Sequence, residues 1–353
     1  MGFKKMEMNF SFADISFLSS LEHNRAIKRM EQINSIVNWS RIERLVLRHY
    51  PVGKSSEGNE AYQPLLLLKC LLLQQWFRID SDPELETQIN DRISFKKFLG
   101  LAIDQPSPDH CTFSRFRSRF SPDVMKKINN ELLTQFASRG LTFNEGIAID
   151  ARLVQSASHP LSEEKLEEER KKRETPEGKL DKNGNPLKFS RDLESDWTVR
   201  NNIPYFGLKE HASVDTRYEF VLATDITPAS CHDSPYLPLC VAGSCHTPDP
   251  IKKVFADKGY WGKNNREFLH RNSIEDGIMR KATYGTELTD YETARNKAIS
   301  KVRYIVEQYF GISHLHYHAH RARFTRMIRN AMDALFRQMV FNLFRGTKVL
   351  KTA

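Results

Sequence analysis

The sequence predicts an α/β domain, with helices packed on a mixed sheet, preceded by an all-helical N-terminal domain. Three observations support this fold class. Helical periodicity dominates residues 12–140, short strand-like apolar runs begin near residue 145, and helical periodicity returns from Thr293 to near Phe344. A chain of 353 residues is long enough for two domains. We therefore expect domains over 1–140 and 141–346, followed by a tail over 347–353.

Several short helices are expected in the N-terminal domain. Leu65, Leu68, Leu72 and Trp76 recur at the spacing of one helical face. Asp82 and Pro83 form a helix-start signal, and later helices are expected near 110–120 and from 122 to Gly140. Short helices with interleaved Arg and Phe are typical of a helix-turn-helix DNA-binding module. A helical bundle used for dimer contacts predicts the same pattern equally well.

The second domain begins with a strand that ends in an acid, Gly146–Asp150. Two consecutive runs, 206–214 and 220–226, predict a hairpin, and residues 251–257 predict a further strand. Between the first strand and the hairpin, residues 161–196 contain 20 charged residues among 36. This composition predicts a solvated insertion, helical in part over 163–173 and with a turn at 182–186.

The charge distribution favours a polyanionic partner. The net charge is +9, and residues 308–353 contain eight basic residues and one acidic residue. No apolar run approaches the length of about 20 residues that a membrane helix needs. The N-terminus lacks the apolar region of a secretion signal, so we expect a cytoplasmic protein without a membrane partner. The five cysteines form no C-x-x-C pair, which predicts reduced structural thiols.

Two acidic residues, Asp150 and Asp257, each follow an apolar run. A carboxylate at the end of a buried strand reaches the sheet edge, and a divalent cation is the usual partner that holds two such groups together. A third acid, Glu307, lies one turn after Arg303 on a helix predicted over 293–310. Strand-end acids also serve as caps, and the helical pair also fits a surface ion pair. The residues alone therefore leave the metal site as one of two interpretations.

Five motifs carry a resemblance to a known family. In chain order they are Pro108–Arg117, Gly146–Asp150, Tyr205–His211 with Thr227–Asp233, Ala256–Tyr260 and Arg303–Gly311. Together they resemble the DDE transposases of bacterial insertion sequences, in the branch typified by insertion sequence five. The resemblance extends over residues 60–345, approximately, and five motifs in the correct order are far more specific than any one of them.

The resemblance implies an RNase H-like catalytic domain, with the first acid on the first strand, the second near the fourth strand and the glutamate on a later helix. It implies that Asp150, Asp257 and Glu307 are the catalytic and metal-binding residues, and that two Mg²⁺ ions, replaceable by Mn²⁺, activate water and then a 3′-hydroxyl. The implied reaction is cut-and-paste transposition at the terminal inverted repeats of the element. The implied partners are double-stranded DNA and a second copy of the chain in the DNA complex, without a small-molecule cofactor.

Twelve residues are candidates for contact with DNA. They are Arg115, Arg117 and Arg119 on the N-terminal domain, Lys209 and His211 on a strand, Lys258, Arg303 and His314 near the acids, and Arg321, Arg323, Arg326 and Arg329 in the basic C-terminal region. Related transposases often have a tyrosine and a lysine where this chain has Ser300 and His314. The alternation of histidines over 314–320 also fits a strand face that binds a transition metal, which we consider the weaker interpretation.

Two other functions use the same features. One is a sequence-specific DNA-binding regulator that has lost catalysis, and the other is a metal-dependent, structure-specific nuclease on the same fold. The presence of all three acids in this chain argues against the regulator. We expect the protein to be nucleoid-associated in a bacterial cell.

Overall fold

A computed structural model describes residues 3–4, 24–50, 52–53, 60–175, 179–180, 184, 191–246, 249–283, 285 and 287–350. The chain divides into two compact units, Met1–Thr142 with Leu335–Ala353 and Phe143–Ala334. The division after residue 142 lies two residues from the domain boundary expected at 140. The C-terminal segment groups with the first unit, whereas the sequence pattern assigned it to the second.

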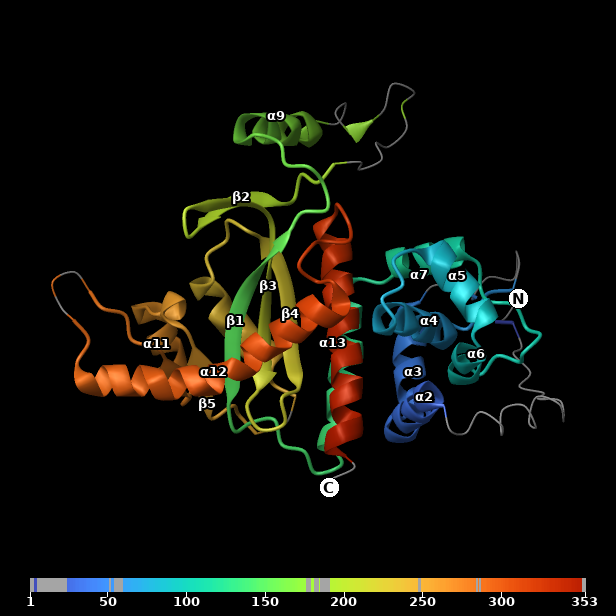
Figure 1. Cartoon of the computed structure of the whole chain (residues 1–353), viewed down its shortest axis with the longest axis horizontal. Coiled ribbons are helices and arrows are strands. Elements are labelled where there is room, and N and C mark those ends of the chain that lie inside the picture. Colours follow the sequence, from blue (N-terminus) through green and yellow to red (C-terminus); the bar gives the residue numbers. More distant parts are fainter. Residues whose placement is uncertain are drawn as a thin grey trace. The chain divides into compact units, whose positions relative to one another are not determined.

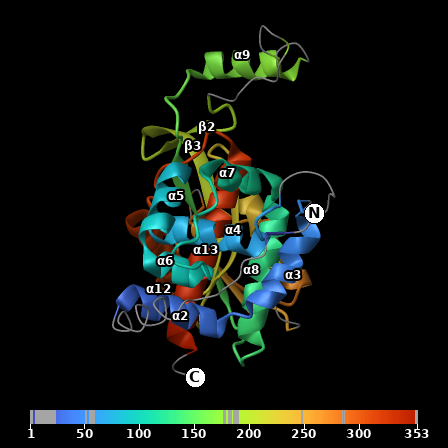
Figure 2. The same cartoon turned by 90° about the vertical axis from the view of Figure 1, so that its right-hand side faces the viewer.

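The first unit is all-helical in its described part (Figures 1 and 2). Its helices are α2 (Arg25–Ile36), α3 (Trp39–His49), α4 (Pro64–Trp76), α5 (Asp82–Asp91), α6 (Ile93–Leu99), α7 (His110–Arg119), α8 (Pro122–Ala137) and the later part of α13 (Met327–Val349). Helix α4 is buried on nearly all sides, so its apolar surface is wider than the single face predicted. The Trp76 ring meets Phe344 edge-on, with 4.6 Å between centroids, which joins α4 to the C-terminal helix.

Side-chain caps fix where these helices begin. Ser81, one residue before the predicted cap Asp82, accepts a hydrogen bond from the Glu84 amide at 3.2 Å. Asp109 and Ser121 cap α7 and α8 in the same way. The helix starts predicted near 82, 110 and 122 are confirmed. The part of the helical region predicted over 12–23 lies outside the described residues.

The second unit is built on a six-stranded mixed sheet. Its strands are β1 (Ile147–Gln155), β2 (Asp196–Arg200), β3 (Ile203–Asp215), β4 (Val221–Pro228), β5 (Lys253–Ala256) and β6 (Glu275–Ile278). Strand β3 pairs antiparallel with β1, β2 and β4, whereas β1, β5 and β6 run parallel to one another. The order β4-β3-β1-β5-β6 is the expected RNase H-like arrangement, and the hairpin and the strand predicted near 251–257 are confirmed. The short, polar strand β6 gave no sequence signal, and neither did helices α10 (Leu237–Gly243) and α11 (Lys263–Arg271).

Helices cover both faces of the sheet (Figure 1). Helix α12 (Asp290–Tyr317) packs on β1, β3 and β5, and α10 packs on β3 and β4. Side chains alternate between the two faces along a strand. Asp150 and Arg152 of β1, with Glu210 of β3, therefore face α12, whereas His211 and Ser213 of β3 face the α10 side.

The helical region predicted from Thr293 to near Phe344 forms two helices, α12 and α13. The chain leaves α12 at His318, which has a left-handed φ of 50°. Gly311, predicted to break the helix, lies inside α12, since one internal glycine costs a helix only about 1 kcal/mol. Helix α13 continues to Val349, so the predicted tail begins later, and residues 351–353 are outside the described part.

The charged insertion contains α9 (Glu163–Glu174), as the sequence predicts, and ends in β2. Figure 1 shows α9 set away from the sheet, beyond the β2–β3 hairpin. Arg170 of α9 donates to the carbonyl oxygens of Leu193 and Ser195, which holds the helix to the chain before β2. Most of the turn predicted at 182–186 lies outside the described residues. No helix within the described ranges is both long enough and apolar enough to span a membrane.

Candidate active site

Two of the candidate acids lie side by side because their strands are neighbours in register. Strand β1 pairs in parallel with β5, with Ile147 opposite Val254 and Ala148 opposite Phe255. The same register, continued for two residues, sets Asp150, inside β1, beside Asp257, the first residue after β5. Strand β1 continues to Gln155, so Asp150 does not end its strand as the sequence predicted. Ile147–Ile149 before Asp150, and Val254 and Ala256 before Asp257, are buried, so both strands are fixed in the core.

Asp257 is held by the turn that follows its strand. It is the N-cap of a short 3₁₀ helix, Lys258–Tyr260, and its Oδ1 accepts a hydrogen bond from the Gly259 amide at 2.7 Å. A Cβ at residue 259 would lie 2.9 Å from that same oxygen, so a larger residue there would displace the carboxylate. Tyr260 is fully buried beneath the turn.

Helix α12 brings an arginine and the third acid to the same place. The buried Arg303 donates from Nη2 to Oδ2 of Asp150 at 2.8 Å. The same Nη2 lies 3.8 Å from Oε1 of Glu307, one turn further along the helix. The Glu307 side chain is 52% exposed, so its carboxylate stands at the open side of the cluster.

The electrostatics show that the three carboxylates affect one another. The pKa of Asp150 is raised from 3.8 to about 6, mainly by burial and also by the charges of Asp257 and Glu307. The Arg303 guanidinium and the Ala151 amide act in the opposite direction and lower this pKa. The cluster therefore contains three acids opposed by one buried arginine, which favours the binding of further positive charge.

A cavity of about 490 Å³ opens beside Asp257 and Arg303. Three further cationic residues line it, Lys258, Arg280 and Lys281. A negatively charged strand would meet matching positive charge on this side of the acids. The sequence pattern identified Lys258 here but missed Arg280 and Lys281, because they follow the short strand β6, which has no periodic signal.

The loop after β6 is fixed to α12 by reciprocal hydrogen bonds. Asn296 accepts from the Arg280 amide at 2.8 Å and donates to the Arg280 carbonyl at 3.0 Å. Arg295 donates to the carbonyl oxygens of Asp276 and Ile278. These bonds align the helix with the carboxyl ends of β5 and β6, and so set the position of Arg303 and Glu307 two to three turns later.

The donor set fits a divalent cation. Carboxylate oxygens are the ligands that Mg²⁺ and Mn²⁺ prefer, and Asp150, Asp257 and Glu307 supply them around a region with unbalanced negative charge. In the described part of the chain, no three acidic, histidine or cysteine side chains already form a closed metal-binding group. In this structure, Arg303 is the cationic partner of Asp150.

The residues predicted to contact DNA fall into two groups. Arg115, Arg119, Lys258, His314, Arg321, Arg326 and Arg329 are exposed, and Arg323 is half-buried. Arg117, His211 and Arg303 are buried, and Lys209 is mostly buried, with 13% of its side chain exposed. Burial leaves Arg117 and His211 no surface to offer to DNA, so we remove both from the predicted set.

Arg117 points into the helical unit because of the helix period. Residues two apart on a helix lie on opposite sides, so Arg117 cannot face the same way as Arg115 and Arg119. Its guanidinium bonds to both carboxylate oxygens of Asp82, at 2.7 and 3.1 Å, and to Gln74 at 3.1 Å. This ion pair joins α7 to the start of α5.

Lys209 and His211, which were predicted to contact DNA, face the covered side of the sheet. The His211 ring stacks on Tyr236, with centroids 4.3 Å apart, and its Nε2 is 2.9 Å from Oγ1 of Thr227. Burial lowers the pKa of His211 from 6.5 to about 4, so the ring is neutral at physiological pH. Lys209 pairs with Asp233 at 2.8 Å. The motifs over 205–211 and 227–233 are therefore joined to each other by packing and hydrogen bonds.

The histidines over 314–320 do not form a strand face. His314 is in α12, His318 ends that helix, and the His314 and His320 rings stack with centroids 4.9 Å apart. No metal-binding group includes them within the described ranges. Arg321 donates to the carbonyl oxygens of Ser156 and Ala157, which ties this turn to the end of β1.

One buried acid was missed by the sequence reasoning. Glu210, with no exposed surface, accepts hydrogen bonds from Arg152 and from the Tyr309 hydroxyl. These contacts join β1, β3 and α12 two residues beyond Asp150. The available signal was a charged residue between Leu208 and Ala212, at alternate positions on an otherwise apolar strand face.

Comparisons with known proteins identify the family of this chain. Residues 142–343 match the family described as Transposase DDE domain, and residues 18–119 match Transposase domain (DUF772). The chain is 30% identical to the transposase for insertion sequence element IS1106 of Neisseria meningitidis serogroup B over 241 residues, 67% of this chain and 78% of the relative. The cryo-EM structure of the piggyBac transposase synaptic complex with hairpin DNA has 8% identity and a TM-score of 0.40, covering 93% of this chain and 75% of that one.

The fold and the matched domains define a DNA-cleaving and strand-transferring enzyme of the divalent-metal-dependent DDE class. The chain belongs to the DDE transposase family of bacterial insertion sequences. The predictions of the family, the fold class and the enzyme class are thereby confirmed.

Proposed function

We propose that this transposase excises and inserts its element by cut-and-paste chemistry at terminal inverted repeats, with two Mg²⁺ ions that Mn²⁺ can replace. The observation that supports this most directly is the convergence of Asp150, Asp257 and Glu307 on Arg303 at one end of the sheet. The same three residues were expected from sequence, and their roles as metal ligands are part of the proposal.

Each side chain has a role that follows from its position. Asp150 of β1 and Asp257, directly after β5, would hold the metal ions from the sheet, and the exposed Glu307 would complete the ligand set from the helix. When bound, the ions would activate the attacking oxygen and neutralise charge on the scissile phosphate. Lys258, on the cavity beside Asp257, would orient the phosphate, and Arg303 would keep Asp150 ionised and in place.

The DNA surface in this proposal consists of the exposed basic residues. Arg115 and Arg119 on α7 are candidates for contact with the element ends, whereas Arg321, Arg323, Arg326 and Arg329 are candidates for backbone phosphates. A homodimer on paired ends, and a nucleoid-associated location, remain parts of the same proposal. They follow from a substrate that has two ends and resides in chromosomal DNA.

The test is a cleavage and strand-transfer assay on DNA carrying the inverted repeats that flank the reading frame. We expect both activities with Mg²⁺ or Mn²⁺ and neither with a chelator. Asp150→Asn, Asp257→Asn and Glu307→Gln should each abolish cleavage while DNA binding stays within about threefold, because removal of a metal ligand leaves the phosphate contacts in place. Glu267→Gln, which changes a surface acid 44% exposed on α11, is the matched control and should keep full activity.

The other outcomes identify the alternative functions. Specific binding without cleavage under every metal condition would indicate a regulator. Cleavage of branched DNA without strand transfer at the repeats would indicate a structure-specific nuclease. Full cleavage by Glu307→Gln would remove Glu307 from the catalytic set.

A further inference from the structure

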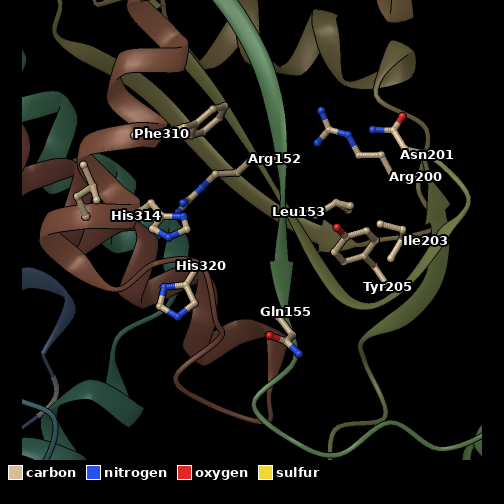
Figure 3. A pocket seen from close by; sticks show the side chains of 12 residues that line it. Arg152, Leu153, Gln155, Arg200, Asn201, Ile203, Tyr205, Phe310, His314 and His320 are labelled. Atoms are coloured by element: carbon tan, nitrogen blue, oxygen red, sulfur yellow. The ribbon is translucent and has the colours of Figure 1, made fainter.

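A second cavity, of about 860 Å³, lies in the same unit beyond the acid cluster. Figure 3 shows its two sides: Arg152, Phe310 and His314 on one, and Arg200, Ile203 and Tyr205 of the β2–β3 hairpin on the other. The strand β1 runs between them. The catalytic chemistry proposed above uses none of the residues that line this cavity.

The walls of the cavity expose apolar and aromatic surface. Ile203 is 54% exposed, Tyr205 is 38% exposed and Leu315 is 69% exposed, three of the large apolar side chains most open to solvent in the described part of the chain. Phe310, on the α12 side, is only 9% exposed, and the Arg152 guanidinium lies over its ring at 5.3 Å from the centroid. Exposed apolar surface of this kind, concentrated around one hollow, is typical of a binding site.

The charge of the cavity is positive. Its twelve lining residues include two arginines and two histidines and no acidic residue. The carboxylate that pairs with Arg152, from Glu210, is completely buried behind the cavity wall. Arg200 is exposed at the tip of the hairpin, where Asn201 and Asn202 form the turn with left-handed φ angles of 52° and 61°.

The cavity and the acid cluster lie along one seam between β1 and α12. Asp150 and Leu153 are three residues apart on β1, and Glu307 and His314 are seven residues apart on α12. At about 3.3 Å per strand residue and 1.5 Å per helical residue, both separations are about 10 Å. That distance is about three steps of 3.4 Å along one DNA strand.

We propose that this cavity binds one unpaired nucleotide of a DNA strand, with the base against the Tyr205 ring and the phosphate at Arg200. Aromatic surface accepts the face of any base, and the exposed guanidinium supplies a phosphate contact. The proposal rests on the proposed function for the position of the strand, since a strand cleaved at the acids would run along the seam into this cavity.

The test measures binding alone, in a chelator, so that cleavage plays no part in it. The probe is a DNA duplex with a three-nucleotide 3′ overhang that carries 2-aminopurine, compared with the blunt duplex of the same sequence. We expect the full chain to bind the overhang duplex about tenfold more tightly and to quench the 2-aminopurine fluorescence. Tyr205→Ala and Arg200→Ala should each remove most of that preference, and Tyr205→Phe should keep it.

Two control variants match these in chemistry but lie elsewhere. Arg217→Ala removes an exposed arginine beyond the opposite end of β3, and Tyr291→Ala removes an exposed tyrosine at the start of α12. Both should keep the preference for the overhang. Free deoxyadenosine monophosphate should compete only at concentrations far above that of the duplex, whereas equal competition would identify a free nucleotide as the ligand.

Three results would overturn the proposal. The first is equal binding of the overhang and blunt duplexes. The second is an equal loss of binding to both duplexes in Tyr205→Ala, which would indicate a general phosphate surface. The third is a change in self-association of Tyr205→Ala in sedimentation, with its DNA preference intact, which would assign this surface to a contact between copies of the chain. Absence of cleavage in the earlier assay would leave this binding measurement unaffected, so the two failures are distinguishable.

Discussion

Removal of one partner of the buried Arg152–Glu210 pair should strongly destabilise the packing between β1, β3 and α12. Neutralisation of both partners should cost much less stability. Arg152 donates to Glu210 from Nε at 2.9 Å and from Nη2 at 2.5 Å. The Glu210 side chain has no exposed surface, and Arg152 is 12% exposed. Arg152→Met therefore leaves the Glu210 carboxylate in the core without its compensating cation, while the Tyr309 hydroxyl still donates to it.

Breaking a buried ion pair from one side costs about 3–5 kcal/mol, so we expect Arg152→Met to lower the local free energy of unfolding by that amount. The double variant Arg152→Met, Glu210→Gln removes both charges, and the glutamine can still accept a bond from Tyr309. We expect the double variant to recover at least about 2 kcal/mol of that loss, which is a coupling within the usual range for contacting residues.

Hydrogen exchange at the β1 and β3 amides is the appropriate assay, because it reports on these strands separately from the helical unit. The control is Arg217→Met, which removes a surface pair with Glu145 whose two side chains are 47% and 46% exposed. That variant should cost less than about 1 kcal/mol. A double variant no more stable than Arg152→Met alone, or an Arg152→Met exchange pattern equal to that of the natural chain, would refute the reasoning.

Other predictions concern the remaining charged groups. Arg117→Met should destabilise the helical unit by about 3 kcal/mol, measured by urea unfolding, whereas Arg119→Ala should leave stability unchanged and weaken binding to the element ends. Burial raises the pKa of Asp215 from 3.8 to about 7 because the folded state favours the neutral, protonated carboxyl. The contribution of this group to the stability of the folded protein is therefore complete below about pH 4 and is lost as the pH rises to about 7. Asp215→Asn should therefore stabilise the protein by up to about 4 kcal/mol at pH 8 and hardly at all at pH 4, measured by urea unfolding at the two pH values. Arg326→Ala should weaken binding to specific and random DNA equally and reduce the slope of log K against log salt by about one unit; a change in sequence preference would contradict a phosphate contact.

The sequence was most informative where one periodicity governs a segment. Apolar runs predicted β1 and β5, and Asp257 directly follows β5 as expected, whereas β1 continues beyond Asp150 to Gln155. Caps at Ser81, Asp109 and Ser121 reproduced the predicted helix starts to within one residue. Predictions from local signals of this kind hold in the folded structure because the groups that produce them are neighbours in the chain.

Errors arose where the decisive partner is distant in sequence. Whether Arg117 meets DNA or Asp82 depends on which side of α7 faces α5, and whether His211 is solvated depends on helix α10, which the sequence did not predict. Arg303 shows the same limit. Its charge suggested a contact with a DNA phosphate, whereas in the folded chain it pairs with Asp150, which is 153 residues away in sequence. Charge alone cannot distinguish a basic residue that binds DNA from one that neutralises the protein's own acids.

Arg303 also explains how three carboxylates can be assembled by folding alone. Asp150 and Asp257 are brought together by the register of β1 and β5, and their mutual repulsion opposes that pairing. Arg303 lies on the same helix as Glu307, so the packing of α12 on the sheet delivers the third acid and the compensating cation in one step. The reciprocal bonds between Asn296 and Arg280 fix that helix to the strand ends. The acids are therefore gathered by ordinary packing of the sheet and helix, and divalent cations would enter a cluster whose geometry the fold has already set.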